Sequence, residues 1–468
     1  MASPSRKRPE PHDHSISPPP LKRRAVQPSI SKSAVANFFT PASQKPKDLT
    51  VWTERSPEEG EPTTLLVAKY VSPDAKSDDQ KQTEVKRRKI AAFDLDSTLI
   101  TPSSGKKHAE GPGDWKWWHN CVPAKLRELH NEGYDIIIFT NQGGLSLHPD
   151  PKAKMPLKNK ARVIHFKTKC GSVLSHLDIP EITLYAATGK DIFRKPRTGM
   201  WEEMKKDLNL SSDRDIDLEN SLFVGDAGGR LAQLPSDGKG KKAIPKDFSC
   251  SDRNMASNVG IRYLTPEEFF LGEEARNFER DFDLSRWPFP EGKGEVEDGK
   301  FEKKNEKELL LFVGPPGAGK STFFWRYLKP LGYERANQDL LKTKEKCLKA
   351  AAGWLEEGES VVVDATNADP DTRRLWVELA RKHKVPVRCV WFKTPLELCM
   401  HNDAVRGLNK NTEHNPEARH MLPGLAFNTF KSRFKEPKVA EGFDEVVPVE
   451  FKFKGTKEEY EIWGRYWV

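Results

Sequence analysis

Short apolar runs alternate with helical stretches along most of this chain. In its first half, the runs cover residues 90–93, 136–139, 182–187 and 221–224. A polar or glycine-containing turn follows each run, as is typical of buried parallel strands in a βαβ arrangement. A second series covers residues 309–313, 360–363, 387–392 and 446–451. The pattern therefore predicts an α/β fold with two tandem domains.

Changes in composition indicate where these domains begin and end. The first 50 residues contain nine prolines and few large apolar side chains, which predicts a disordered tail. The stretch from about 50 to 75 is more apolar and predicts a hairpin packed on the first domain. A region dense in charge, glycine and proline predicts a linker. The expected division is a basic tail (1–50), a first domain (51–271), a linker (272–306) and a second domain (307–468).

Length and composition narrow the class of protein. A chain of 468 residues suits two or three domains. It contains no run of about 20 apolar residues, which excludes a transmembrane helix, and its charged, proline-containing start does not predict a secretory signal. Its six cysteines form no CxxC pair, which argues against a zinc ribbon or a disulfide scaffold and favours a reducing compartment.

The net charge of +8 is concentrated near the N-terminus. Residues 1–50 carry nine Lys/Arg and three Asp/Glu, a net of +6, which leaves +2 for the rest. Basic clusters at 6–8 and 22–24 have the spacing of a bipartite nuclear import signal, and the alternative is a solvated basic tail. We therefore expect a nuclear protein. Its nearly neutral body need not wrap DNA, and if it binds nucleic acid, it does so in local grooves.

Two carboxylates follow the apolar run 90–93 in the pattern DxDxT. Asp94 and Asp96 would lie at the carboxyl end of a strand, where α/β folds bind ligands. One carboxylate can attack phosphorus and form an aspartyl-phosphate, and the other can protonate the leaving oxygen and then activate water. Carboxylates that face a phosphate need a cation, and Mg²⁺ is the expected one. This pattern resembles the haloacid dehalogenase-like phosphatases.

Further polar residues follow the next strands in the order that such a phosphatase needs. Thr140 and Asn141 can hydrogen-bond a phosphoryl group, Lys195 can neutralise its charge, and Asp226 can hold the metal. Each residue alone fits a helix cap or a surface position as well, but their order at successive strand ends favours the phosphatase. A second acid is expected near Asp226, and the sequence leaves two candidates, Asp247 and Asp252.

The second domain begins with a P-loop. The strand 309–313 runs into a full GxxxxGK[ST] match formed by Gly314, Pro315, Pro316, Gly317, Ala318, Gly319, Lys320, Ser321 and Thr322. Backbone N–H groups of such a loop surround phosphates at a helix N-terminus. Lys320 would reach the β- and γ-phosphates, and Ser321 would coordinate Mg²⁺.

Residues after the P-loop favour a kinase. Asp339 can accept the proton of an attacking hydroxyl. Asp364 ends a strand as a Walker B-like acid or caps the next helix. Arg406, on an expected helix, is either a lid residue over the phosphates or a solvated arginine. A guanine-reading NKxD motif is missing where a GTPase would carry it.

The order of the two modules resembles the eukaryotic polynucleotide kinase 3′-phosphatases. The resemblance covers residues 85–468, and the stretches DFSCSDR (247–253) and TPEEFFL (265–271) are specific to it. It implies a haloacid dehalogenase-like phosphatase domain, a P-loop kinase domain and DNA end repair. The first activity would remove 3′-phosphates, and the second would transfer the γ-phosphate of ATP to 5′-hydroxyl ends. Mg²⁺, ATP, DNA ends and a monomeric state are implied.

The resemblance also implies individual roles. Asp94 would be the nucleophile and Asp96 the general acid and base. Asp226 would hold Mg²⁺ together with Asp94 and the backbone carbonyl of Asp96. Phosphate binding falls to Thr140, Asn141 and Lys195. In the kinase, the implied roles are ATP and metal binding (Lys320, Ser321), general base (Asp339) and lid arginine (Arg406).

Two departures from this family stand out. Vertebrate members carry an N-terminal forkhead-associated domain, whereas only 93 residues precede Asp94 here, so we expect no such domain and no phosphopeptide docking. The lid helix has Ala404 where the family tends to place a second arginine.

Three further features concern partners and substrate. Val35, Phe38 and Phe39 resemble the box that docks on the replication sliding clamp, or they pack back on the body. The tryptophans of 115–118 would stack on a single-stranded end or, as we favour, pack in the core. The candidates for contacts with the DNA backbone are Arg162, Arg197, Arg230 and Arg253.

Three alternative functions share these motifs. They are a fused small-molecule phosphatase and kinase, an RNA-end-processing enzyme, and a scaffold with inactive domains. The basic tail and the DFSCSDR stretch argue against the first, and intact Asp94, Asp96, Lys320 and Asp339 argue against the last.

Overall fold

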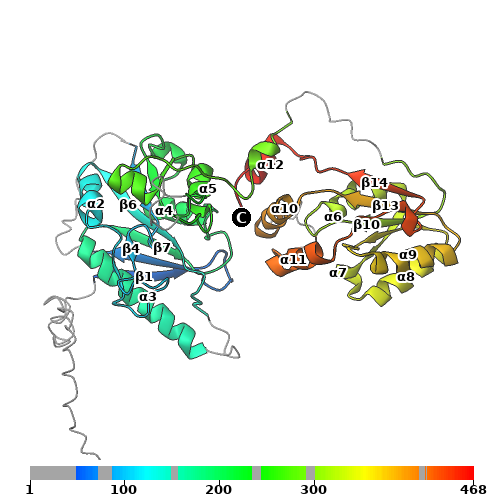
Figure 1. Cartoon of the computed structure of the whole chain (residues 1–468), viewed down its shortest axis with the longest axis horizontal. Helices are drawn as coiled ribbons and strands as arrows, with labels where there is room; N and C mark the ends of the chain where they lie inside the picture. Colours follow the sequence, from blue (N-terminus) through cyan, green and yellow to red (C-terminus); the bar gives the residue numbers. More distant parts are fainter. Residues whose placement is uncertain are drawn as a thin grey trace, which may run out of the picture. The chain divides into compact units, whose positions relative to one another are not determined.

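The structure is a computed structural model of the chain (Figure 1). It describes residues 49–71, 87–148, 156–233, 244–290, 301–409, 417 and 419–468. Residues 1–48 of the expected disordered tail lie outside the described residues, and so do its two basic clusters and the motif formed by Val35, Phe38 and Phe39. The last residue of the expected tail, Thr50, begins strand β1 (Thr50–Arg55). Two tandem α/β domains make up the described part.

The first domain is built on a seven-stranded sheet with the order β1-β2-β7-β6-β3-β8-β9. The strands are β1 (Thr50–Arg55), β2 (Leu65–Tyr70), β3 (Lys89–Phe93), β6 (Tyr134–Asn141), β7 (Thr183–Ala187), β8 (Leu222–Val224) and β9 (Arg262–Leu264). The last five are parallel, and β1 and β2 form the expected hairpin, joined antiparallel to β7. The strand order changes direction at β3, so the carboxyl end of β3 is the switch point where such sheets bind ligands.

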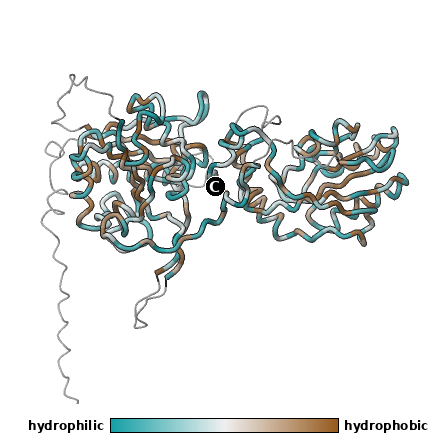
Figure 2. The backbone as a smooth tube through the Cα atoms, turned by 90° about the horizontal axis from the view of Figure 1, so that it is seen from above, coloured by the Kyte–Doolittle hydropathy of each residue, from teal (hydrophilic) through white to brown (hydrophobic). Residues whose placement is uncertain are grey.

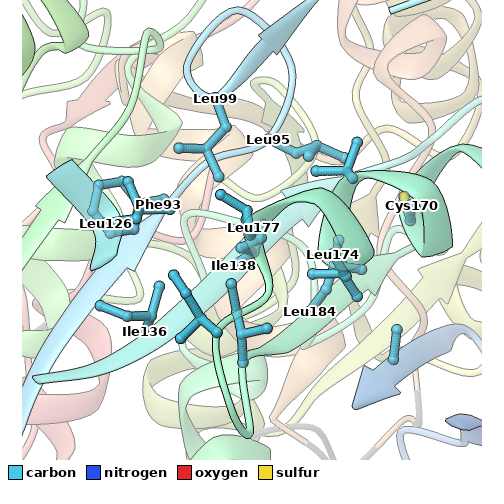
Figure 3. Packing of buried hydrophobic residues seen from close by; sticks show 14 of the residues in the cluster. Phe93, Leu95, Leu99, Leu126, Ile136, Ile138, Cys170, Leu174, Leu177 and Leu184 are labelled. Carbon is cyan, nitrogen blue, oxygen red and sulfur yellow. The ribbon is translucent and has the colours of Figure 1, made fainter. Parts of the chain in front are cut away.

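Helices cover both faces of this sheet. One face carries α2 (Val122–Asn131) and α3 (Pro156–Leu177), and the other carries α4 (Gly199–Asp207) and α5 (Ser251–Val259). Figure 3 shows Cys170, Leu174 and Leu177 of α3 packed against apolar side chains of β3, β6 and β7. The sheet is thus buried on both sides, which explains its continuous apolar runs.

The tryptophans of 115–118 are packing residues. Trp115, Trp117 and Trp118 are partly buried against the core on the α2 and α3 face, and Trp118 lies 6.0 Å from Phe270 between ring centroids. Trp117 belongs to the short strand β5 (Lys116–Trp117), and Trp115 and Trp118 flank it; β5 pairs with β4 (Ile100–Thr101). The interpretation of these rings as core packing is therefore confirmed.

The second domain has a fully parallel five-stranded sheet with the order β11-β12-β10-β13-β14. Its strands are β10 (Leu309–Val313), β11 (Tyr333–Asn337), β12 (Ser360–Asp364), β13 (Val387–Phe392) and β14 (Glu445–Val449). One face packs on α8 (Lys344–Glu356) and α9 (Pro370–Lys382), as Figure 1 also shows. The other face packs on α6 (Lys320–Phe323), α10 (Leu396–Leu408) and α11 (Gly424–Arg433).

Hydropathy follows this layering. Figure 2 shows apolar stretches gathered in the interior of the folded parts and hydrophilic stretches toward the surface. Within the described ranges, no helix has both the length and the apolar character needed to cross a bilayer.

Part of the expected linker is packed. Phe282 and Leu284 form a small apolar cluster with Leu398 of α10 and Trp463 of α12 (Lys457–Trp463). The high average content of charge and proline in this stretch hides these apolar positions. The boundaries 51–271 and 307–468 stay a prediction.

His401 of α10 is a buried histidine that makes this region acid-sensitive. Its ring is fully buried, Nε2 donates to the carbonyl of Trp463 at 2.8 Å, and Phe282 lies 4.6 Å away between ring centroids. Burial lowers the pKa of His401 to about 4, against 6.5 for an ordinary histidine, although the bond to Trp463 opposes this shift. Below pH 6.5, the unfolded chain therefore gains a proton that the folded chain does not hold.

We expect wild-type stability to fall more steeply than that of His401→Gln as the pH drops from 6.5 toward 4. The differential loss is about 2 kcal/mol at pH 5, from about 1.4 kcal/mol per pKa unit. Denaturant unfolding at pH 7, 6 and 5 measures it, with the exposed His108→Gln as the control. Parallel stability curves for wild type and His401→Gln would contradict the assignment.

Candidate active sites

The first site lies at the carboxyl end of β3. Asp94 follows this strand directly and is only 8% exposed. Its backbone N–H donates to the carbonyl of Val224 in β8. The chain then turns at Ser97, where φ is 63°, and the N–H of Ser97 donates to the carbonyl of Ile100. This turn leaves Asp96 at the mouth of the site, with half of its side chain exposed.

Three carboxylates meet at this point. One oxygen each from Asp94, Asp226 and Asp252 lies within 4.8 Å of the others. Lys195 donates to Asp94 Oδ1 at 2.5 Å and contacts Asp252 Oδ1 at 2.8 Å. One lysine against three acids leaves an excess of negative charge, and carboxylate oxygens are the ligands that Mg²⁺ prefers. The donor set therefore fits a divalent cation.

The electrostatics of the cluster agree with this fit. Burial raises the pKa of Asp94 to about 7 and that of Asp226 to about 8. Lys195 opposes both shifts, whereas the neighbouring carboxylates add to them. Burial alone would lower the pKa of Lys195, but Asp252 and Asp94 raise it overall. A cation at the cluster would relieve the repulsion among the acids.

The structure separates the two candidates for the second acid. Asp252, at the start of α5, is 1% exposed and reaches the cluster. A Cβ at position 225 would lie 2.3 Å from Asp252 Oδ2, so Gly225 leaves the room that this carboxylate occupies. Asp247 instead accepts hydrogen bonds from the side chain and backbone N–H of Arg230. Asp252 is thus the acid of the cluster, and Asp247 holds a loop.

Residues after β6 connect the pieces of this site. Thr140 ends the buried part of the strand, and its hydroxyl accepts a hydrogen bond from Gln142 Nε2 at 2.9 Å. Asn141 exchanges two hydrogen bonds with the backbone of Lys195, so it fixes the loop that carries this lysine. Gln142 also donates to Asp96 Oδ2 at 2.7 Å. Sequence reasoning missed Gln142, although it follows Thr140 and Asn141 directly.

Most of the arginines expected to contact DNA have internal partners. Arg197 and Arg230 are 7% and 6% exposed, and their guanidinium groups bond to backbone carbonyls or acids. Arg253 is half-buried, stacked on Tyr263 and Phe278. The expectation is wrong for Arg197 and Arg230, because hydrogen bonds and ion pairs inside a fold leave no signature in local sequence.

The second site is the P-loop between β10 and α6. Gly317 has φ of 77°, and a Cβ there would lie 2.2 Å from the carbonyl oxygen of Cys399, so only glycine fits. Lys320 is 8% exposed, and its Nζ donates to the carbonyls of Gly314 (3.0 Å) and Pro315 (2.5 Å). Burial lowers the pKa of Lys320 to about 8, despite the opposing charge of Asp364.

Asp364 lies beside the P-loop, as a Walker B acid would. Ser321 Oγ donates to Asp364 Oδ2 at 3.0 Å, and the same oxygen pairs with Arg335. The next helix, α9, is capped by Asp369, whose side chain accepts from the N–H of Thr372. Asp364 therefore has no capping role, and a hydroxyl with an adjacent carboxylate fits Mg²⁺.

A cavity of about 1810 Å³ adjoins these residues. Its lining includes Lys320, Asp339, Asp364, Arg406 and Arg419. Asp339 lies in the first turn of the short helix α7 (Gln338–Leu341). Its side chain is 70% exposed and contacts Arg419 at 3.1 Å. Arg406 pairs with Asp403 at 2.6 Å.

The position of Ala404 is explained by packing, because this residue is fully buried in α10. Arg419 brings a further positive charge to the cavity from a different segment, and Arg335 pairs with Asp364. Neither was recognised from sequence, since both depend on contacts between distant segments.

Two family models match separate stretches of the chain. A family model described as polynucleotide kinase 3 phosphatase matches residues 89–270, and one described as an AAA domain matches residues 342–437. The chain is 38% identical over 384 residues to a bifunctional polynucleotide phosphatase/kinase of Schizosaccharomyces pombe, covering 82% of this chain and 84% of that protein. It is 36% identical over 392 residues to a putative bifunctional polynucleotide phosphatase/kinase of Acanthamoeba polyphaga mimivirus, covering 81% and 88%.

A third relative matches a smaller share of this chain. The polynucleotide 3′-phosphatase of Saccharomyces cerevisiae is 30% identical over 227 residues, covering 39% of this chain and 87% of that protein.

Proposed function

Because the chain belongs to the family of bifunctional polynucleotide phosphatase/kinases, we propose that it restores both termini of broken DNA strands. The first domain removes 3′-phosphates, and the second phosphorylates 5′-hydroxyl ends with ATP. The observation that carries this proposal is the cluster of Asp94, Asp226, Asp252 and Lys195, in a chain that also holds a P-loop cavity. Two separate phosphate-handling sites match a substrate with two termini.

The phosphatase reaction uses Asp94 and Asp96 in two steps. Asp94 attacks the phosphorus, and the bond from phosphorus to O3′ breaks while Asp96 gives its proton to O3′. A water molecule then gives a proton to Asp96, attacks the phosphorus and releases Asp94 and inorganic phosphate. Thr140, near the carboxyl end of β6, and Lys195, on a neighbouring loop, bind the oxygens of the phosphoryl group. Mg²⁺, held by Asp94, Asp226 and Asp252, would supply positive charge for the phosphate.

The kinase reaction uses the cavity beside the P-loop. Lys320 releases its contacts with the carbonyls of Gly314 and Pro315 and binds the β- and γ-phosphates of ATP. Asp339 accepts the proton of the 5′-hydroxyl while the hydroxyl oxygen attacks the γ-phosphorus. The bond between the γ-phosphorus and the β–γ bridging oxygen breaks, and ADP leaves. Arg406 and Arg419 lie on the cavity wall, where they stabilise phosphate charge. Mg²⁺, held by Ser321 and Asp364, would complete the neutralisation.

The N-terminal tail carries the sequence features that bear on the location and the protein partners of the enzyme. We propose that the basic clusters at 6–8 and 22–24 direct import into the nucleus and that Val35, Phe38 and Phe39 dock on the sliding clamp. We further propose that the enzyme acts as a monomer.

The test is a nicked DNA duplex with a 3′-phosphate and a 5′-hydroxyl, incubated with Mg²⁺ and with or without ATP. The 3′-phosphate is expected to disappear in both reactions, and the 5′ end to gain phosphate only with ATP. If neither terminus changes while small phosphate esters are hydrolysed, a small-molecule enzyme is the better assignment. Preference for the matching RNA substrate would instead favour RNA-end processing.

Asp252→Asn is expected to raise the Mg²⁺ concentration for half-maximal phosphatase activity by about tenfold or more. It removes one anionic oxygen from the cluster while keeping the side-chain volume, and a single ligand change typically costs this much metal affinity. A Mg²⁺ titration of 3′-phosphate release measures the shift. Asp247→Asn is the comparison, because that residue pairs with Arg230 outside the cluster. Equal Mg²⁺ requirements in Asp252→Asn and wild type would contradict the assignment.

A further inference from the structure

Lys169 of α3 is a covered lysine at the mouth of the phosphatase site. Its Nζ lies 3.1 Å from Asp96 Oδ1, and its side chain is only 12% exposed. An ammonium group that is largely removed from water needs a partner, because burying an unpaired charge is costly. The stem of Lys169 passes Phe166, which places Nζ 5.6 Å from that ring centroid. The helix therefore delivers this one positive charge to the carboxylate of Asp96.

Asp96 receives a donor on each of its oxygens. Lys169 contacts Oδ1, and Gln142 Nε2 donates to Oδ2 at 2.7 Å. The same Gln142 nitrogen also donates to the hydroxyl of Thr140 at 2.9 Å. Since the Asp96 side chain is 51% exposed, packing alone does not fix its rotamer. Its orientation depends on the two donors, which come from α3 and from the end of β6.

We propose that Lys169 is a positioning residue of the 3′-phosphatase, which holds Asp96 in the orientation that its two proton transfers require. This inference rests on the proposed function. An ionised carboxylate has about four lone-pair sites, so one donor on each oxygen leaves room for the proton that Asp96 exchanges. Lys169 itself gains or loses no proton in either step. It acts by keeping the Asp96 carboxylate aimed at O3′ and later at the attacking water.

The same helix provides a matched control. Lys167 pairs with Glu54 at 3.3 Å and lies over the Trp52 ring at 5.6 Å from its centroid, facing a different part of the domain. Lys167→Met thus removes an ammonium group from α3 without touching Asp96. Any effect that Lys169→Met shares with Lys167→Met comes from the loss of a lysine on α3 and not from the loss of the contact with Asp96.

The test begins with steady-state kinetics on the 3′-phosphorylated duplex, using the full chain. Lys169→Met is expected to lower kcat by about tenfold or more, because small misplacements of a catalytic group have effects of this size. KM is expected to stay within about twofold, since no substrate contact is removed. Lys169→Arg, which keeps a donor, is expected to recover part of the loss, and the 5′-kinase activity is expected to be unchanged.

A double-mutant cycle then asks whether Lys169 acts through Asp96. In single-turnover reactions, Lys169→Met is expected to change the rate by less than about twofold once Asp96→Asn is present, because coupled residues are not additive. An undiminished effect in that background would overturn the proposal. A raised KM with an unchanged kcat would also overturn the proposal. So would a slope of log affinity for DNA against log salt concentration that is smaller by about one. Either result would show that Lys169 binds a phosphate of the DNA backbone.

The 3′-phosphatase activity of the wild-type protein separates a failure of this proposal from a failure of the proposed function. If wild type removes no 3′-phosphate, the function itself is wrong. If wild type is active and Lys169→Met equals it, only the role of Lys169 is overturned. Should Lys169→Met fold poorly in a melting comparison with Lys167→Met, Lys169→Gln replaces it in the same cycle.

Discussion

Replacement of Asp94 by asparagine is expected to lower 3′-phosphatase activity by at least about 10⁴-fold while leaving 5′-kinase activity unchanged. An amide of nearly the same shape fills the same space, but it is a poor nucleophile toward phosphorus and forms no aspartyl-phosphate. The substitution also removes one of the three carboxylates that meet at the end of β3. Loss of the attacking group and of a metal ligand act on the same step, so the effect is large.

The measurement follows both termini of the nicked duplex separately. Asp135→Asn is the matched control, because Asp135 pairs with Arg88 away from the cluster, and its activities are expected to stay within about twofold of wild type. Acid-quenched protein from the wild-type reaction should carry radioactive phosphate from a labelled 3′ end, and Asp94→Asn should carry none. Residual phosphatase above one hundredth of wild type would show that another residue attacks the phosphorus.

Replacement of Lys320 by methionine is expected to lower 5′-kinase activity by about 10³-fold and to spare the 3′-phosphatase. Methionine keeps the length and apolar character of the stem but removes the charge that would meet the β- and γ-phosphates. The partners of Lys320 Nζ in this structure are two backbone carbonyls, so the substitution removes the hydrogen-bond partner of no buried carboxylate. The loss is therefore expected in catalysis and not in folding.

ATP-dependent phosphorylation of the 5′-hydroxyl measures this effect, with 3′-phosphate release in the same tube as the internal reference. Lys329→Met, at an exposed position after the same helical segment, is expected to retain both activities. If Lys320→Met lost both activities with an unchanged melting curve, the two sites would not be independent. That outcome would contradict the assignment of one activity to each domain.

Local sequence predicted those parts of the fold and sites that reside in consecutive residues. The central strands β3 and β10 contain continuous apolar runs, so Asp94 and Asp96 after β3 and the P-loop after β10 were recognisable. The strands β9 and β11 carry charged residues and lack this signature. The reason is physical, because a strand covered on both faces must be apolar throughout, and its carboxyl end must carry the polar groups that bind ligand.

Contacts between distant segments decided the rest. Asp247 and Asp252 are equivalent by sequence, yet one pairs with Arg230 and the other reaches Asp94. The role of Asp364 likewise depended on Ser321, 43 residues earlier in the chain.

The sequence by itself thus determined two α/β domains, a pair of carboxylates after β3 and a P-loop, because periodicity and short motifs encode them locally. Only the tertiary structure decided that Asp252 completes the acidic cluster and that Lys169 meets Asp96, 73 residues away. The tertiary structure also showed that Arg197 and Arg230 are buried and bond to groups within the protein. Charged side chains pair with residues that are close in the fold but distant in the sequence. The energy of a buried charge therefore depends on neighbours that the local sequence does not contain.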